Sequence, residues 1–168
     1  DSLKVMGREG NILAQVSCQS WDDGDLRVMT KASSEIATGA HISIIGHTTK
    51  ELLLRHLDET EKASGFANRF VFVCVRRANI LPLGGSITEA ALAPVVSGLR
   101  GAIEFGREVG EMTFDEAALG RWLEVYPTLS EGRPGLVGAI TARASAQALR
   151  LAVTYALLDL SEIIALPH

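Results

Sequence analysis

The sequence of 168 residues is poor in the side chains that build disulfide frameworks and metal centres. Its two cysteines, Cys18 and Cys74, lie far apart and form no CxxC motif, which argues against a disulfide scaffold and a cysteine-rich zinc site. The four histidines are scattered and lack the HExxH spacing of zinc enzymes. We therefore expect no metal site, and we expect the protein to work in a reducing environment.

Long apolar runs and a large net charge are also missing. No stretch approaches the ~20 apolar residues that cross a bilayer, and no signal-peptide pattern opens the chain. These absences predict a cytoplasmic protein without a membrane partner. Because the net charge is −4, we do not expect the chain as a whole to be a basic nucleic-acid-binding module. The net charge does not exclude local basic sites.

A nucleotide-binding loop is the third absence. No GxxxxGKS/T motif occurs, and the glycine-containing segment GREGN at residues 7–11 lacks the lysine and the hydroxyl residue that hold phosphate and magnesium. No acidic strand of the Walker B type stands in the early part of the chain. We therefore expect that this chain alone does not bind or hydrolyse ATP.

A hydrophobic content of 47% nevertheless supports a folded core. Residues 2–20 predict a helix, and residues 26–30 and 35–38 predict a β-hairpin around a polar turn that carries Lys31. The apolar runs HISIIGH, residues 41–47, and RFVFVCV, residues 69–75, are typical of strands buried on both faces of a parallel sheet. With a helix expected over residues 50–62 between them, they predict a right-handed βαβ unit.

The second half of the sequence is helical in pattern. Helices are expected from a capping box at Ser86 to Gly106, from a capping box at Thr113 to Tyr126, and from Leu136 to Asp159. The sequence therefore predicts an α/β domain over residues 1–80 and an all-helical domain over residues 81–168. Because the chain opens in helical rhythm without an initiator methionine, and stops as another element begins, we expect it to be part of a longer protein.

Arg69 stands at the start of the second apolar run, where an unpaired charge would cost several kcal/mol if buried. Two interpretations are open at this point. The guanidinium either has a local acidic partner or points at a ligand outside the core.

Polar groups also follow the first apolar run. Thr48 with Glu51 fits a capping box for the following helix, and His47 fits an ordinary histidine at the end of a strand. A polar side chain at the carboxyl end of a central strand is also where NTPases sense the γ-phosphate or the attacking water. The two roles are compatible.

The helix expected from Leu136 carries a polar stripe. Arg143, Gln147, Arg150 and Thr154 follow one another at intervals of four, three and four, which places them on one face. The arginines of this stripe either bridge to carboxylates of a neighbouring helix or form an anion clamp, since guanidinium suits phosphate geometry.

The order of these elements resembles the later part of the AAA+ ATPase core, especially that of the minichromosome-maintenance replicative helicases, whose LLSRFDL segment is similar to FANRFVF here. More closely, ATGAHISIIGHTTKELLLRHLDETEKASGFANRFVFVCVRR and ARASAQALRLAVTYALLD resemble an uncharacterised bacterial family of phage and mobile-element replication proteins. Its members are often fused to primase/polymerase modules. That family carries Walker A and Walker B segments upstream of the matching region, and the resemblance extends from Leu3 to the end of the chain.

The resemblance implies a partial P-loop NTPase-like parallel sheet with a β-hairpin insertion, followed by an all-helical lid. Arg69 would be the arginine finger of a neighbouring subunit's ATP site in a homo-oligomeric ring, with His47 or Thr48 at the sensor-1 position, which usually holds asparagine. Arg143 would be the sensor-2 arginine, with Arg150 beside it on the nucleotide-binding face. The hairpin would contact DNA through Lys31 and Arg27.

Two functions follow as expectations. In the first, the chain is part of a helicase-like ATPase of mobile-element DNA replication, whose upstream Walker half supplies the site for ATP and Mg²⁺. In the second, it is a non-catalytic module that binds DNA or another protein.

Overall fold

The computed structural model describes residues 12–29, 34–56 and 65–168. The chain forms two compact units, each made of two segments. The first unit combines Asp1–Val71 with Gly132–Arg143, and the second combines Phe72–Glu131 with Ala144–His168. The protein is thus a mixed α/β chain, as its sequence predicts. The predicted domain boundary near residue 80 remains a prediction.

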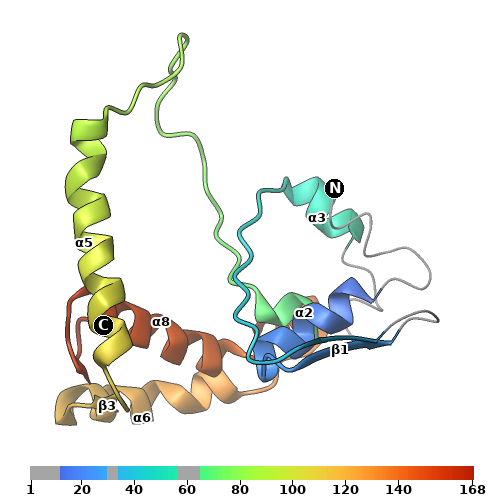
Figure 1. Ribbon diagram of the computed structural model, residues 1–168. Helices are drawn as coiled ribbons and strands as arrows, with labels where there is room; N and C mark the ends of the chain where they lie inside the picture. The colour runs from blue at the N-terminus through green and yellow to red at the C-terminus, as the bar shows by residue number, and fades with distance from the viewer. Residues whose placement is uncertain (1–11, 30–33, 57–64) are drawn as a thin grey trace. The chain divides into compact units, whose positions relative to one another are not determined.

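The first unit opens with a helix and a hairpin (Figure 1). Helix α2 spans Leu13–Asp22 and continues two residues beyond the predicted end at residue 20; the earlier part of that predicted helix lies outside the described residues. Strands β1 (Leu26–Met29) and β2 (Ser34–Ala37) pair antiparallel. The predicted hairpin is confirmed, while its tip lies outside the described residues.

Gly24 fixes the turn between α2 and β1. Its φ of +75° lies in the left-handed region that favours glycine, and a Cβ at this position would lie 2.6 Å from the carbonyl oxygen of Ala40. The Gly24 carbonyl accepts a hydrogen bond of 2.9 Å from the Ala40 N–H. This close approach ties the end of α2 to the end of the hairpin.

The described residues of the first unit also contain three short helices. Helix α3 spans Lys50–His56, a single 3₁₀ turn (η1) spans Ala67–Arg69, and α7 spans Gly135–Thr141. Turn η1 lies against α7, and the side chains of Phe66 and Ala67 are buried there. The remainder of the helix predicted over 50–62 lies outside the described residues.

The two predicted parallel strands are wrong. Residues 41–47 and 70–75 are not in strands, and Arg69 ends a 3₁₀ turn. The apolar side chains of residues 42–45 and 71–75 are exposed; Ile45, Val73 and Val75 are 91%, 74% and 81% exposed. A strand that is apolar on both faces needs hydrogen-bonded neighbours and covering layers, and the described residues supply none for either run. The two apolar runs, residues 41–47 and 71–75, therefore lie open.

The second unit is a helical assembly with a small parallel sheet. Helices α5 (Glu89–Glu108) and α6 (Glu116–Ser130) pack against α8 (Ala144–Leu158), as can be followed in Figure 1. Strands β3 (Thr113–Phe114) and β4 (Ile163–Ile164) pair in parallel. The core of this unit consists of small residues and one isoleucine, namely Ala102, Ala118, Ala156 and Ile164.

Two predicted helix starts are displaced along the chain. The side chain of Thr88, not Ser86, caps α5 by accepting from the Ala91 N–H at 3.3 Å. The side chain of Asp115, not Thr113, caps α6 by accepting from the Ala118 N–H at 2.7 Å. An N-cap oxygen must lie within reach of the N–H groups of the first turn, and only the nearer polar residue does in each case.

The ends of the later helices also differ from the predictions. Helix α6 continues through Pro127 to Ser130, because the helix around a proline can persist where flanking packing supports it. The predicted helix over 136–159 is broken between Thr141 and Ala144 into α7 and α8. None of the described helices has the length and apolar character needed to cross a membrane.

Candidate anion-binding site

Arg69 ends turn η1 with its side chain only 9% exposed. Its Nη2 lies 2.6 Å from Oδ2 of Asp22, the last residue of α2, and its Nη1 donates to the Gly65 carbonyl at 2.8 Å. The interpretation that Arg69 has an acidic partner within its own chain is confirmed. The carboxylate offsets the cost of placing the charge at the start of an apolar run.

Arg143 meets the same carboxylate. Its Nη1 lies 3.4 Å from Oδ1 of Asp22, so the two carboxylate oxygens serve different arginines. Both guanidinium groups also lie over the ring of Trp21, with the Cζ of Arg143 at 4.7 Å and that of Arg69 at 5.7 Å from the ring centroid. Two arginines predicted separately from the sequence thus converge on one carboxylate and one aromatic ring within the first unit.

The position of Asp22 does not suit its own helix. A carboxylate at the C-terminal end of a helix faces the negative end of the helix dipole, which costs roughly 0.3–1 kcal/mol. The two arginines compensate for this cost. The ion pairs with Arg69 and Arg143, and not the dipole of α2, therefore stabilise the Asp22 carboxylate.

One edge of the Arg69 guanidinium is only partly used. Its Nε is buried and has no hydrogen-bond partner among the described residues. Nε and Nη2 lie on the same edge of the guanidinium plane, which is the edge that receives two oxygens of one carboxylate or phosphate in side-on pairing. Asp22 contacts this edge through a single oxygen, so the side-on pairing is incomplete.

The backbone of Gly65 lies close to the guanidinium group of Arg69. Its φ is +73°, and a Cβ added there would lie 3.0 Å from the Nη1 of Arg69. The glycine of the GFANRF segment therefore serves two purposes, because it adopts the left-handed conformation and leaves room for the guanidinium.

We expect Gly65→Ala to lower the free energy of unfolding by about 1–2 kcal/mol from backbone strain, with more from displacement of Arg69. Gly39→Ala is the matched control, because Gly39 has a φ of +62° and open space around its Cβ position. Urea denaturation measures the free energy of unfolding of both variants. Equal losses would show that Gly65 makes no close contact with the guanidinium.

The other residues predicted for the site belong to other segments of the chain. His47 and Thr48 lie in an exposed segment before α3, and Thr49, not Thr48, caps that helix by accepting from the Leu52 N–H at 3.2 Å. Arg27 is exposed on β1, and Lys31 lies outside the described residues. Arg150 lies within α8 in the second unit, so the predicted stripe is divided after Arg143.

Asp22 and Trp21 were missed by reasoning from the sequence. They belong to the segment WDDGD, whose aspartates and glycine indicated only the end of a helix. An acidic cluster next to a tryptophan, in a chain with an arginine at the start of an apolar run, was the available signal for an ion pair stacked on an aromatic ring.

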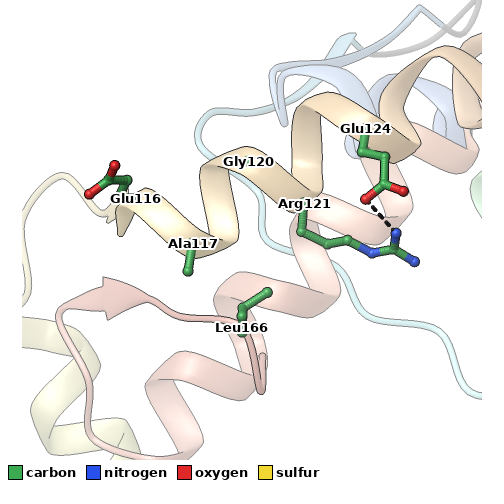
Figure 2. Close-up of a pocket in the computed structure, with 6 residues that line it drawn as sticks. All are labelled: Glu116, Ala117, Gly120, Arg121, Glu124 and Leu166. Atoms are coloured by element: carbon green, nitrogen blue, oxygen red, sulfur yellow. Dashed lines mark hydrogen bonds and ion pairs between the residues drawn. The ribbon is translucent and has the colours of Figure 1, made fainter.

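A second concave feature lies in the second unit. A hollow of about 620 Å³ lies along α6. It is lined by five residues of that helix and by Leu166, which are labelled in Figure 2. It is open, and its one arginine, Arg121, already pairs with Glu124 at 2.7 Å on the same helix. The charged side chain outside this pair is Glu116, a carboxylate, so the hollow offers no further positive charge to an anion. The cluster around Asp22 is therefore the stronger candidate for an anion.

The fit of ATP and Mg²⁺ can be judged on the same residues. The half-used edge of Arg69, with Arg143 beside it, suits a phosphate group. Among the described residues, no group of three or more His, Cys, Asp or Glu side chains could hold a metal ion. The arginines therefore fit part of a nucleotide, while the described residues do not provide a magnesium site.

Comparison of the chain with protein-family models, with curated proteins and with solved structures gives no match.

Proposed function

We propose that this chain is the carboxyl-side part of a P-loop ATPase, helicase-like in type, that acts in cytoplasmic DNA replication of a phage or mobile element. In this proposal Arg69 and Arg143 supply positive charge to the polyphosphate of a nucleotide bound by a neighbouring subunit of a ring. The observation that carries the proposal is the convergence of both arginines on one anion, at a site where one guanidinium edge remains half-used.

The open apolar runs support the same proposal. Residues 41–47 and 71–75 have the composition of central parallel strands, and they are exposed and pair with no strand among the described residues. A P-loop core would provide the missing neighbouring strands through its Walker A and Walker B segments. Arg69 precedes the second run directly, which would bring it to the edge of such a sheet.

The nucleotide and Mg²⁺ belong to the part of the protein that carries the P-loop. This chain contributes charge: a guanidinium beside the γ-phosphoryl group stabilises the negative charge that develops there during transfer. Because Arg69 is held by Asp22, it must exchange the carboxylate for the phosphate to take this role.

The test is ATP hydrolysis by a longer protein in which a P-loop segment precedes this sequence. We expect turnover by the longer protein and none by the 168 residues alone. Since the arginine acts on a neighbouring subunit, the activity per subunit should rise with protein concentration as rings assemble. Absence of turnover at every concentration, in a protein that binds ATP, would contradict the proposal.

A second candidate function is a non-catalytic module that docks on another protein or on DNA. The exposed apolar side chains of the two runs favour docking on a protein. Salt-dependent binding of single-stranded DNA that Arg27→Ala or Lys31→Ala removes would favour DNA contact by the hairpin instead. Binding of a partner by a longer protein that never hydrolyses ATP would favour this second function over the first.

A further inference from the structure

We infer that Asp22 is an internal competitor that occupies the phosphate position of the arginine pair and must be displaced before a polyphosphate binds there. This inference rests on the proposed function, because it assigns a regulatory contact to the same site. The ligand class is an inorganic or nucleotide diphosphate or triphosphate, whose terminal phosphoryl group offers three oxygens where the carboxylate offers two.

The contacts of Asp22 are those of an imperfect ligand. Its Oδ2 makes a short contact of 2.6 Å with Arg69, whereas its Oδ1 lies 3.4 Å from Arg143. The Nε–H of Arg69 donates to no acceptor among the described residues. A tetrahedral oxyanion has enough oxygens to fill the Nε–Nη2 edge of Arg69 and to reach Arg143 together, which a planar carboxylate on a fixed helix end does not achieve.

The burial of the partners indicates which of them moves. The Arg69 side chain is 9% exposed and is also anchored to the Gly65 carbonyl, while the Asp22 side chain is 43% exposed. Asp22 also lies at the helix end where a carboxylate is least favoured. Release of Asp22 to solvent leaves the arginines in place beside the Trp21 ring for an incoming anion.

Trp21 provides a reporter of the exchange, because both guanidinium groups lie over its ring. The only other tryptophan, Trp122, stacks with Phe114 in the second unit. In a Trp122→Phe background, the fluorescence of the chain therefore comes from Trp21 alone. Titration with inorganic pyrophosphate at constant ionic strength follows occupation of the site without any ATP hydrolysis.

The decisive comparison is Asp22→Asn with Asp23→Asn in that background. Both variants remove one negative charge from the same turn, but Asp23 forms no ion pair among the described residues, and asparagine retains the oxygen that accepts from the Asp25 N–H. We expect Asp22→Asn to bind pyrophosphate about tenfold more tightly than the parent and Asp23→Asn to match the parent. Adding Arg69→Gln to Asp22→Asn should abolish the gain.

Equal affinities of the two asparagine variants, or a gain that persists without Arg69, would overturn the inference. If circular dichroism shows that Asp22→Asn is unfolded, the inference is tested by titrating the Trp122→Phe protein, in which Asp22 is unchanged. Millimolar pyrophosphate must then change Trp21 fluorescence, and the change must vanish in Arg69→Gln; no change would overturn the inference. Pyrophosphate binding that follows the expected pattern, combined with a longer protein that never hydrolyses ATP, would refute the proposed function alone.

Discussion

Arg69→Ala is expected to lower ATP turnover by the longer protein about 10³- to 10⁵-fold while nucleotide binding is largely retained. The reason is that an arginine supplied to a neighbouring subunit stabilises charge that is present mainly in the transition state, so that its loss affects turnover more than affinity. Steady-state hydrolysis and equilibrium binding of a nucleotide, measured on the same preparation, separate the two effects.

Two further variants control this experiment. Arg69→Lys keeps the charge but cannot pair side-on with a phosphate, so most of the loss should remain. Arg121→Ala removes an exposed arginine whose described partner is Glu124 of the same helix, and it should leave turnover unchanged. A parallel loss of binding and turnover in Arg69→Ala would contradict the assignment, because it would show a general structural defect.

The second large effect is expected for Phe66 in the GFANRF segment. Phe66 is 7% exposed, and its ring lies 4.8 Å from that of Phe70, centroid to centroid, in a tilted arrangement. Phe66→Ala removes this contact and opens a cavity next to the buried Ala67. We expect it to lower the free energy of unfolding by about 3 kcal/mol, measured by urea denaturation.

Phe72→Ala is the matched control for Phe66→Ala. Phe72 is 42% exposed in the open run, so its replacement should cost well under about 1 kcal/mol in the 168-residue chain. In the longer protein, where a P-loop sheet would cover the run, the same change should become costly. Equal losses from Phe66→Ala and Phe72→Ala in the short chain would contradict the burial described for the GFANRF segment.

The success of the hairpin prediction and the failure of the parallel strands have one physical cause. A hairpin pairs residues close in the sequence, so strands β1 and β2 carry their own partners. The runs at 41–47 and 69–75 have the composition of buried parallel strands, but composition does not supply the neighbouring strands that such a sheet needs. The apolar composition of these runs therefore did not determine whether they pair with neighbouring strands.

The displaced helix starts show a similar limit. Each predicted capping box placed a hydroxyl residue three positions before Glu51, Glu89 or Glu116. In the structure these glutamates lie in the first turns of α3, α5 and α6, and a nearer threonine or aspartate caps each helix. A glutamate in the first turn is favoured by the helix dipole whether or not it belongs to a capping box, so the pattern located each helix but not its first residue.

The candidate site could be predicted only in part. Arg69 stands out in the sequence as a charge at the start of an apolar run and Arg143 as a member of a polar stripe, and both belong to the observed cluster. Their shared partner Asp22 depends on long-range packing, since η1, α7 and α2 come together only in the folded first unit. The grouping of Arg143 with Arg150 relied on one continuous helix, which the break before Ala144 removes.

The central claim is that Arg69 acts on a phosphate bound by another subunit, and a mixing experiment tests it most directly. One version of the longer protein carries Arg69→Ala with an intact P-loop, and the other carries Arg69 with its P-loop lysine replaced. Each version alone should be inactive. We predict that mixing them restores ATP turnover, because mixed rings contain sites with both an intact P-loop and an adjacent Arg69; no recovery in rings shown to contain both versions would contradict the account.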